Sequence, residues 1–134
     1  MTPAEALRAY CDAFAARDVE RVVALFAANA LHELPLVRPR LVGAAEIRAG
    51  LTCAFAVVTD CRIALARVHE TGSTALAEGV MELGLARAPG RASLPFALVG
   101  VISDGRLGRL SAYLDARPFR PFTDGPVLAL EPVP

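Results

Sequence analysis

The sequence is poor in the features that most directly identify a function. Its 14 basic and 14 acidic residues cancel, so it has no excess of charge to attract nucleic acid or an acidic membrane surface. No stretch reaches the roughly 18 continuous apolar residues of a membrane span. Glu5, Arg8 and Asp12 interrupt the region where a signal peptide is apolar. We therefore expect a cytoplasmic protein that binds neither nucleic acid nor membranes.

The residues that hold metals and cofactors are also scarce. Cys11, Cys53 and Cys61 are odd in number and lack CxxC spacing, so we expect reduced, mostly buried thiols. His32 and His69 lie far apart and give no metal-ligand spacing. The glycines near the C-terminus are not followed by a helix, which excludes a phosphate-binding loop there. The sequence indicates no metal and no other cofactor.

What the sequence does contain is enough apolar material for one substantial core. Its 134 residues are 54% hydrophobic, which suits a single domain. Residues 121–134 are rich in proline, and we expect them to form an extended tail. The domain is therefore expected to occupy residues 1–120.

Helical signals dominate the first part of the chain. A capping box opens a helix that should reach Arg17, and Asp18 can cap a second helix that we expect to end at Asn29. A loop over 37–42 then precedes a third helix, which begins at Gly43. The segment NALHELPL between the second and third helices reads as a short strand.

Strand signals dominate the remainder. Turn sequences separate four segments of strand character, and such short connections make neighbouring strands antiparallel. The expected strands are 61–69, 73–87, 92–102 and 107–119. The sequence therefore predicts an α+β fold in which helices pack on one face of a curved sheet.

Alternation along these strands separates an inner face from an outer one. In the strand 73–87, Glu78 and Glu82 share the outer face and should be solvated. The strand 92–102 is apolar on both faces, so its outer side needs cover, and a second copy of the chain could supply it. The last strand is expected to present a polar outer or dimer-facing stripe, formed by Arg109, Ser111, Tyr113 and Asp115.

The segment NALHELPL contains two candidate acid–base residues, His32 and Glu33. Neighbours on a strand point to opposite faces, so without a bulge only one can enter the interior. Glu33 inside would have a raised pKa and could donate or accept a proton, whereas outside it would pair with Arg38 or Arg40. His32 inside could act as a base within reach of Tyr10, or could be satisfied by a backbone carbonyl.

Three stretches carry a resemblance to a known family. They are AEALRAYCDAFAARDVERVVALFAANALHELPL, GAAEIRAGL and LGRLSAYLDARPF. Over residues 3–120 the chain resembles the SnoaL-like group of the nuclear-transport-factor-2-like superfamily. This resemblance implies a cone in which a strongly bent antiparallel sheet wraps around N-terminal helices and encloses one apolar pocket. Such proteins are usually dimers.

The resemblance to ketosteroid isomerases, one branch of this superfamily, is incomplete. Tyr10 matches the tyrosine of helix one that stabilises an oxyanion in that family. Leu34 stands where the family has its general-base aspartate, and Ala97 where it has a second oxyanion-hole acid. These departures argue against steroid isomerisation.

The chain also resembles limonene-type epoxide hydrolases in the stretches LPL and YLDARPF. In that family an arginine bridges two aspartates that hold a water and protonate the epoxide. Gly79, Met81 and Ala112 stand at those three positions, and Glu33 stands at the position of a water-positioning asparagine. The known triad is therefore absent.

The residues and the resemblance together predict a cofactor-independent isomerase, cyclase or hydrolase for a small hydrophobic molecule, polyketide- or terpenoid-like. Glu33 or His32 would handle the proton and Tyr10 would orient or stabilise an oxygen. The alternatives are a non-catalytic ligand-binding module and a dimeric interaction module. The expected substrate-binding residues are Phe14, Leu34, Phe55, Met81, Phe96, Leu98, Ala112 and Leu114.

Overall fold

Helices and a single sheet make up the fold. The computed structural model describes residues 1–36, 40–87, 90–115 and 117. The helices are α1 (Pro3–Ala15), α2 (Val19–Val23) and α3 (Gly43–Val57). The strands are β1 (Phe26–Glu33), β2 (Arg40–Val42), β3 (Val58–Thr71), β4 (Thr74–Leu85), β5 (Arg91–Ser103) and β6 (Arg106–Leu114). No helix in these parts of the chain is long and apolar enough to cross a membrane.

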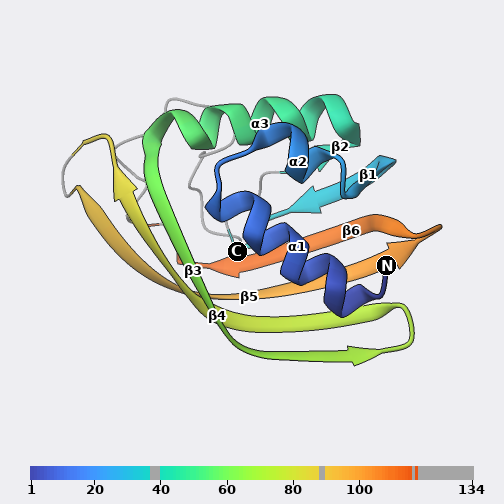
Figure 1. The fold of residues 1–134 in the computed structure, drawn as a ribbon. Helices are drawn as coiled ribbons and strands as arrows, with labels where there is room; N and C mark the ends of the chain where they lie inside the picture. Colours follow the sequence, from blue (N-terminus) through green and yellow to red (C-terminus); the bar gives the residue numbers. More distant parts are fainter. Residues whose placement is uncertain (37–39, 88–89, 116, 118–134) are drawn as a thin grey trace.

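The sheet has six strands in the order β2-β1-β6-β5-β4-β3, and its two edges do not meet. The antiparallel meander from β3 to β6 is as predicted. It curves around α1, and α3 lies across the end of the sheet near β1 and β3 (Figure 1). This confirms the α+β class and the bent sheet around N-terminal helices. The sheet is mixed rather than wholly antiparallel, because β1 runs parallel to β6.

The second helix is shorter than the sequence predicted. It ends at Val23, and the expected end at Asn29 is wrong. From Phe26 the chain instead pairs with β6, where Phe26 lies opposite Leu107 and the Leu107 N–H donates to the Leu25 carbonyl at 2.8 Å. Pairing with a strand far along the chain thus overrides the local preference of an alanine-rich segment for a helix.

The predicted loop over 37–42 is wrong in part. Arg40–Val42 forms the edge strand β2, which pairs antiparallel with β1 so that Glu33 faces Arg40 and Leu31 faces Val42. Residues 37–39, the last residues of the expected final strand (118–119) and the expected tail over 121–134 lie outside the described residues.

Local hydrogen bonds fix the corners between the helices. The capping box is present, with the Glu5 N–H donating to Thr2 Oγ1 at 3.1 Å. Arg17, just after α1, has a positive φ of 54°. Its guanidinium donates to the carbonyls of Phe55 at 2.9 Å and Thr59 at 3.0 Å. The corner between α1 and α2 is thereby attached to the end of α3.

The core lies between α1, α3 and the inner face of the sheet. In β4, Glu78 and Glu82 are exposed as predicted, and the alternate positions are buried. Gly100 of β5 lets α1 come close, because a Cβ at this position would lie 2.7 Å from Leu7 Cδ2. The largest fully buried side chains are Leu7, Val22, Ile47, Leu83, Leu107 and Leu110.

Candidate functional site

His32 is the polar residue that enters the apolar interior. Along β1 the side chains of Phe26, Ala30 and His32 are buried, and that of Glu33 points to the opposite face. His32 is only 6% exposed. Of the two adjacent residues His32 and Glu33, it is therefore His32 whose side chain enters the interior.

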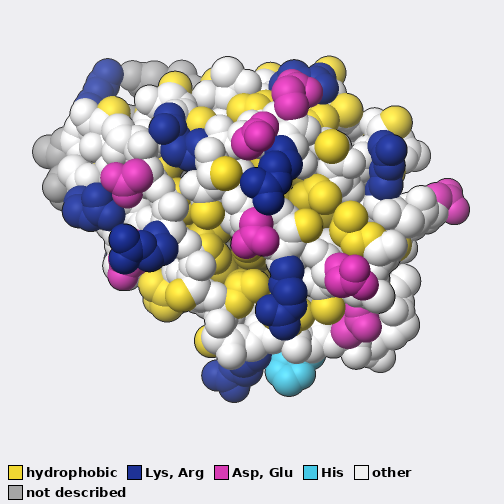
Figure 2. Space-filling view, in the orientation of Figure 1, with side chains coloured by type: hydrophobic (Ala, Val, Ile, Leu, Met, Phe, Trp, Pro, Cys, Tyr) yellow, Lys and Arg dark blue, Asp and Glu magenta, His cyan; other side chains and the backbone are white. Residues whose placement is uncertain are grey.

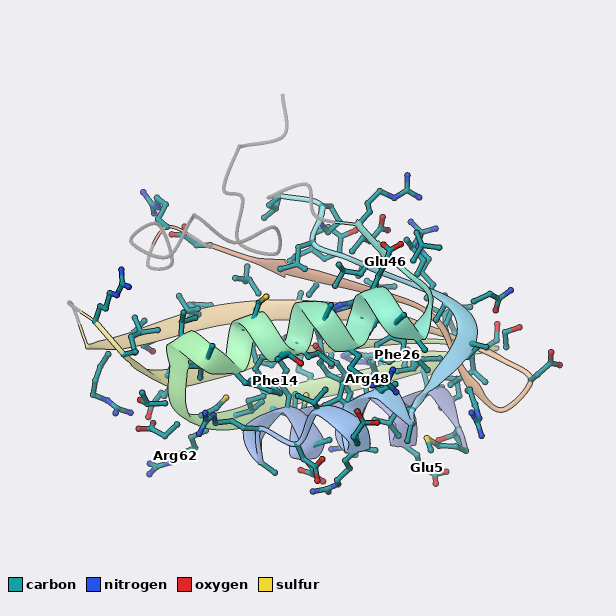
Figure 3. All side chains as sticks on the ribbon, turned by 90° about the horizontal axis from the view of Figure 1, so that it is seen from above. Glu5, Phe14, Phe26, Glu46, Arg48 and Arg62 are labelled. Atoms are coloured by element: carbon teal, nitrogen blue, oxygen red, sulfur yellow. The ribbon has the colours of Figure 1, made fainter. Side chains whose placement is uncertain are left out.

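Aromatic rings surround the His32 imidazole. Its centroid lies 5.7 Å from that of Phe26 and 6.1 Å from that of Tyr10 on α1. Tyr10 in turn contacts Phe14, whose ring lies 4.9 Å from that of Phe55 on α3. In the view of Figure 3, Phe14 and Phe26 are labelled on the side of α3 that is nearer to α1. The site therefore consists of the His32 imidazole and a row of aromatic side chains that contact one another beside it.

Both ring nitrogens of His32 are buried and have no hydrogen-bond partner among the described residues. The predicted alternative, a backbone carbonyl that satisfies the ring, is not what the structure shows. A buried polar atom without a partner costs about 1–3 kcal/mol. Such orphaned groups in native proteins call for a specific explanation, and a bound molecule is one of them.

Burial also determines the charge of His32. Desolvation lowers its pKa from 6.5 to about 4, and the neighbouring Glu33 carboxylate opposes this only in part. The imidazole is therefore neutral at physiological pH. A neutral imidazole presents one N–H donor and one acceptor nitrogen.

Tyr10 is the second predicted site residue that the fold brings to this place. Burial raises its pKa well above the usual value, and Cys11 and Cys61 add to the effect. The phenol therefore stays protonated and is available as a hydrogen-bond donor.

Glu33 lies on the outer face of the sheet and not beside Tyr10. Its Oε1 accepts from Arg109 Nε at 3.1 Å and from Ser111 Oγ at 2.9 Å, and Arg40 Nε lies 3.9 Å from its Oε2. Burial raises the pKa of the carboxyl, but the hydrogen bonds from Arg109 and Ser111 outweigh it and hold the pKa below its usual range. The side chain is therefore an ionised group whose Oε1 is held by Arg109 and Ser111 on the outer face.

The expected substrate-binding residues all belong to the core or pack against it. Five of them are buried: Phe55, Met81, Phe96, Leu98 and Ala112. The remaining three, Phe14, Leu34 and Leu114, are half-buried against the same cluster. Between α1 and β3, where Phe14 and Cys61 are half-buried, hydrophobic side chains reach the surface among arginine and acidic side chains (Figure 2).

The thiols of Cys11 and Cys61 do not add a nucleophile. Burial raises the pKa of Cys11 to about 12 and that of Cys61 to about 11. Both are therefore thiols at neutral pH, and the attacking species would be the thiolate. Cys53 is exposed on α3. In the described part of the chain, no three histidines, cysteines or carboxylates come together to hold a metal ion.

Sequence reasoning missed two contributors to this arrangement. Phe26 falls within the second helix that the sequence predicted, and instead it borders His32 from β1. Ser111 was assigned to a polar outer stripe, but its role as a partner of Glu33 depends on the parallel pairing of β1 with β6. That pairing joins segments about eighty residues apart along the chain, and no local pattern announces it.

Comparison with known proteins identifies the family. The profile of the SnoaL-like domain matches residues 7–110. A search of curated protein sequences finds no match.

Solved structures share the fold at low sequence identity. A protein with a ketosteroid isomerase-like fold from Catenulispora acidiphila, in complex with trimethylamine, has a TM-score of 0.76 at 18% identity, over 84% of this chain and 86% of that chain. An LEH-like epoxide hydrolase from M. tuberculosis has a TM-score of 0.73 at 21% identity, over 87% and 84%. A proposed polyketide cyclase from Pseudomonas putida has a TM-score of 0.72 at 24% identity, over 89% and 96%. Since the family profile spans most of the chain, this protein belongs to the SnoaL-like domain family.

Proposed function

We propose that this protein binds a small apolar molecule between α1, α3 and the inner face of the sheet, and that it transforms this molecule by acid–base chemistry without a cofactor. The observation that carries the proposal is His32, a buried imidazole with both nitrogens unpaired, next to the protonated phenol of Tyr10. The proposal is compatible with the fold, which an LEH-like epoxide hydrolase and a proposed polyketide cyclase share.

In this mechanism the unprotonated nitrogen of His32 removes a proton from a carbon next to a carbonyl group. The electron pair moves onto the carbonyl oxygen, and the Tyr10 hydroxyl donates a hydrogen bond to the enolate that forms. In a β,γ-unsaturated ketone the electron pair also reaches the γ carbon, which takes the proton back from the imidazolium as the double bond moves into conjugation, and this completes an isomerisation. In a molecule with a second carbonyl group, the enolate carbon attacks that carbonyl carbon, the C=O π bond breaks, and its oxygen takes the proton from the imidazolium, which closes a ring. The apolar wall excludes water and strengthens both electrostatic interactions.

One observation favours a second candidate, ligand binding without catalysis. A general base works best when its pKa lies near the working pH, and the pKa of His32 is only about 4. Catalysis therefore requires the developing oxyanion to stabilise the imidazolium as an ion pair. If no substrate does so, the same residues would hold a ligand and leave it unchanged.

The test is turnover and binding across a panel of ketones and epoxides, with the wild type, His32→Leu and Tyr10→Phe. Removal of a general base typically costs about 100- to 10,000-fold in rate, so we expect His32→Leu to lose turnover to that extent. Tyr10→Phe should lose about tenfold or more because it removes one hydrogen-bond donor. His69→Leu is the matched control, since it makes the same substitution at an exposed histidine on β3.

The outcomes separate the two candidates. Equal turnover in the wild type, His32→Leu and Tyr10→Phe would remove both residues from the mechanism. Saturable, His32-dependent binding with no change in any ligand would instead select the binding module. Glu33→Gln should retain most turnover, because its carboxylate lies on the other face of β1.

We further propose that two copies of the chain associate through the outer face of the sheet. Leu76 and Val80 of β4 and Tyr113 of β6 are large hydrophobic residues exposed on this face. Half-buried Val99 lies between them, opposite both Leu76 and Ser111. An uncovered apolar patch of this kind marks an interaction surface.

Light scattering should give the mass of a dimer for the wild type and of a monomer for Val80→Arg. A monomeric wild type would contradict the proposal.

A further inference from the structure

His32 and its aromatic neighbours form a row that approaches the surface at Phe14. The rings of His32, Tyr10, Phe14 and Phe55 follow one another at centroid distances of 6.1, 5.9 and 4.9 Å. Three of these side chains are buried, and that of Phe14 is half-buried. Phe14 belongs to α1 and Phe55 to α3, so their contact joins the two helices. Along this row, a molecule from the solvent reaches His32 only if Phe14 and Phe55 separate.

Arg17, which follows Phe14 by about one helical turn, connects the C-terminal ends of the same two helices. Its Nη2 donates to the Phe55 carbonyl at 2.9 Å and its Nη1 to the Thr59 carbonyl at 3.0 Å. Phe55 lies in the last turn of α3, and Thr59 lies at the start of β3. In Figure 1 the C-terminal ends of α1 and α3 lie on the same side of the molecule, next to the start of β3. One side chain therefore holds the joint between α3 and β3 against the end of α1.

The positive charge of Arg17 is favourable at this place. The last four carbonyls of a helix have no partner within the helix and carry a partial negative charge. The last turn of α3, which lies wholly within the described residues, has no basic side chain of its own. Arg17 brings that charge from the end of another helix, and a charged donor makes a stronger hydrogen bond than a neutral one. The contact therefore stabilises the closed arrangement of the two helix ends.

The backbone of Arg17 is strained in this arrangement. Its φ is 54°, and the Asp18 N–H donates to the Ala13 carbonyl at 3.2 Å, as in a Schellman motif. Glycine is the usual residue at such a position, because a residue with a Cβ is disfavoured in the left-handed region. The bonds of the side chain to residues 38 and 42 positions further along the chain offset this strain. Because the backbone can relax once the guanidinium lets go, the strain favours release.

Building on the proposed site at His32, we propose that Arg17 is a latch that controls access to it. While the guanidinium holds the carbonyls of Phe55 and Thr59, the rings of Phe14 and Phe55 stay in contact and the row is closed. When the guanidinium releases them, the ends of α1 and α3 separate at Phe14, and a small molecule reaches the imidazole.

Diethyl pyrocarbonate measures access to His32 directly, with no need to know the ligand. This reagent acylates neutral imidazoles that are in contact with solvent. The chain has 2 histidines, and the other one, His69 on β3, is exposed. Peptide mass spectrometry gives the rate of acylation at His32 relative to that at His69 in the same molecule. In the wild type this ratio should be far below one.

The variants test whether Arg17 sets the ratio. Arg17→Gln removes the charged donor and should raise the ratio by about tenfold or more, which is the factor for one hydrogen bond from a charged group. Arg17→Gly removes the same side chain but suits the positive φ, so it should raise the ratio while the fold stays stable. Arg48→Gln is the matched control, because it makes the same substitution in an exposed pair between α3 and Glu20 of α2. It should leave the ratio unchanged.

The wild type alone provides a second measurement, which does not depend on how the variants fold. Separation of two helix ends exposes little surface, so the acylation of His32 should depend only weakly on urea below the unfolding transition. A dependence as steep as that of global unfolding would show that His32 is reached only in the unfolded chain, and would overturn the proposal.

The remaining outcomes separate the latch from the proposed function. An unchanged ratio in both Arg17 variants, or an equal rise in Arg48→Gln, would overturn the latch and leave the role of His32 in turnover untouched. A ratio near one in the wild type would also overturn the latch, since His32 would then not be closed off. If the Arg17 variants raise the ratio but His32→Leu keeps full turnover and binding, the proposed function fails and the latch stands.

Discussion

The two faces of β1 differ in how the polar residue on each is hydrogen-bonded. On the outer face, Glu33 is ionised and accepts hydrogen bonds from Arg109 and Ser111. On the inner face, His32 is neutral and both of its nitrogens lack a partner among the described residues. A polar group whose hydrogen-bond partners come from the chain itself contributes to the stability of the fold. One that the fold buries and leaves unsatisfied is a site where another molecule can bind, at some expense in stability.

The largest expected effect on stability is acid sensitivity from the inner face. The pKa of His32 is 6.5 in the unfolded chain and about 4 in the folded one, so between these values the unfolded state binds more protons. The free energy of unfolding should therefore fall as pH decreases through this window, by about 3 kcal/mol in total from His32 alone. Urea unfolding of the wild type and His32→Leu at neutral and acidic pH measures the difference.

At neutral pH, His32→Leu should be as stable as the wild type or more so, because an apolar side chain replaces an unsatisfied polar one. Its stability should decline less in acid than that of the wild type, and His69→Leu should follow the wild type. Parallel acid profiles for wild type and His32→Leu would show that His32 is not buried as a neutral imidazole.

The next effect in size comes from the outer face. Glu33→Leu leaves the buried Ser111 hydroxyl and the Arg109 guanidinium without their acceptor, so we expect a loss of about 1–3 kcal/mol at neutral pH. Glu33→Gln keeps an acceptor oxygen and should lose about half as much. Chemical unfolding at neutral pH measures both, and adding Ser111→Ala to Glu33→Leu should restore part of the loss.

The contribution of Glu33 to the free energy of unfolding also falls in acid, but for the opposite reason: the folded state favours the charged form of Glu33 and the neutral form of His32. Because the pKa of Glu33 is lowered in the folded state, its contribution is present above the unfolded pKa and lost as pH falls through the folded one. The deficit of Glu33→Gln relative to the wild type should therefore shrink in acid. A deficit that grows in acid would contradict the ion pair with Arg109.

The smallest expected effect belongs to the rim of the same cluster. The side chain of Arg40 is 67% exposed and its Nε lies 3.9 Å from Glu33 Oε2. Exposed pairs of this kind contribute about 0–1 kcal/mol, so Arg40→Ala should change the free energy of unfolding by less than Glu33→Gln does. A loss from Arg40→Ala as large as that from Glu33→Leu would mean that Arg40, and not Arg109 and Ser111, holds the carboxylate.

Local signals in the sequence were sufficient for most of the fold. The capping box at Thr2, the cap at Asp18 and the turns between the long strands all mark real boundaries. The errors lie where pairing between strands decides. Phe26 lies in a strand because it pairs with Leu107 of β6, and Arg40 lies in a strand because it pairs with Glu33 of β1.

For the candidate site too, the sequence predicted the local features and missed those that depend on the pairing of strands. Alternation along a strand is local, so the sequence could state that His32 and Glu33 take opposite faces. Which of the two faces α1 depends on the register with β6, and that register was not accessible from spacing alone. The partners of Glu33 were likewise hidden, although Arg109 and Ser111 had been placed correctly on one stripe.

The register between β1 and β6 shifts between Phe26 and Leu31, where five steps along β1 correspond to two along β6. Because side chains alternate along a strand, the loss of one residue from this stretch would exchange the two faces downstream if Phe26 stays paired with Leu107. Deletion of Ala28 would then turn Glu33 inward and His32 outward, which modification of the imidazole by diethyl pyrocarbonate would detect. On this expectation, a single deleted codon would replace the neutral imidazole of the interior with a carboxylate.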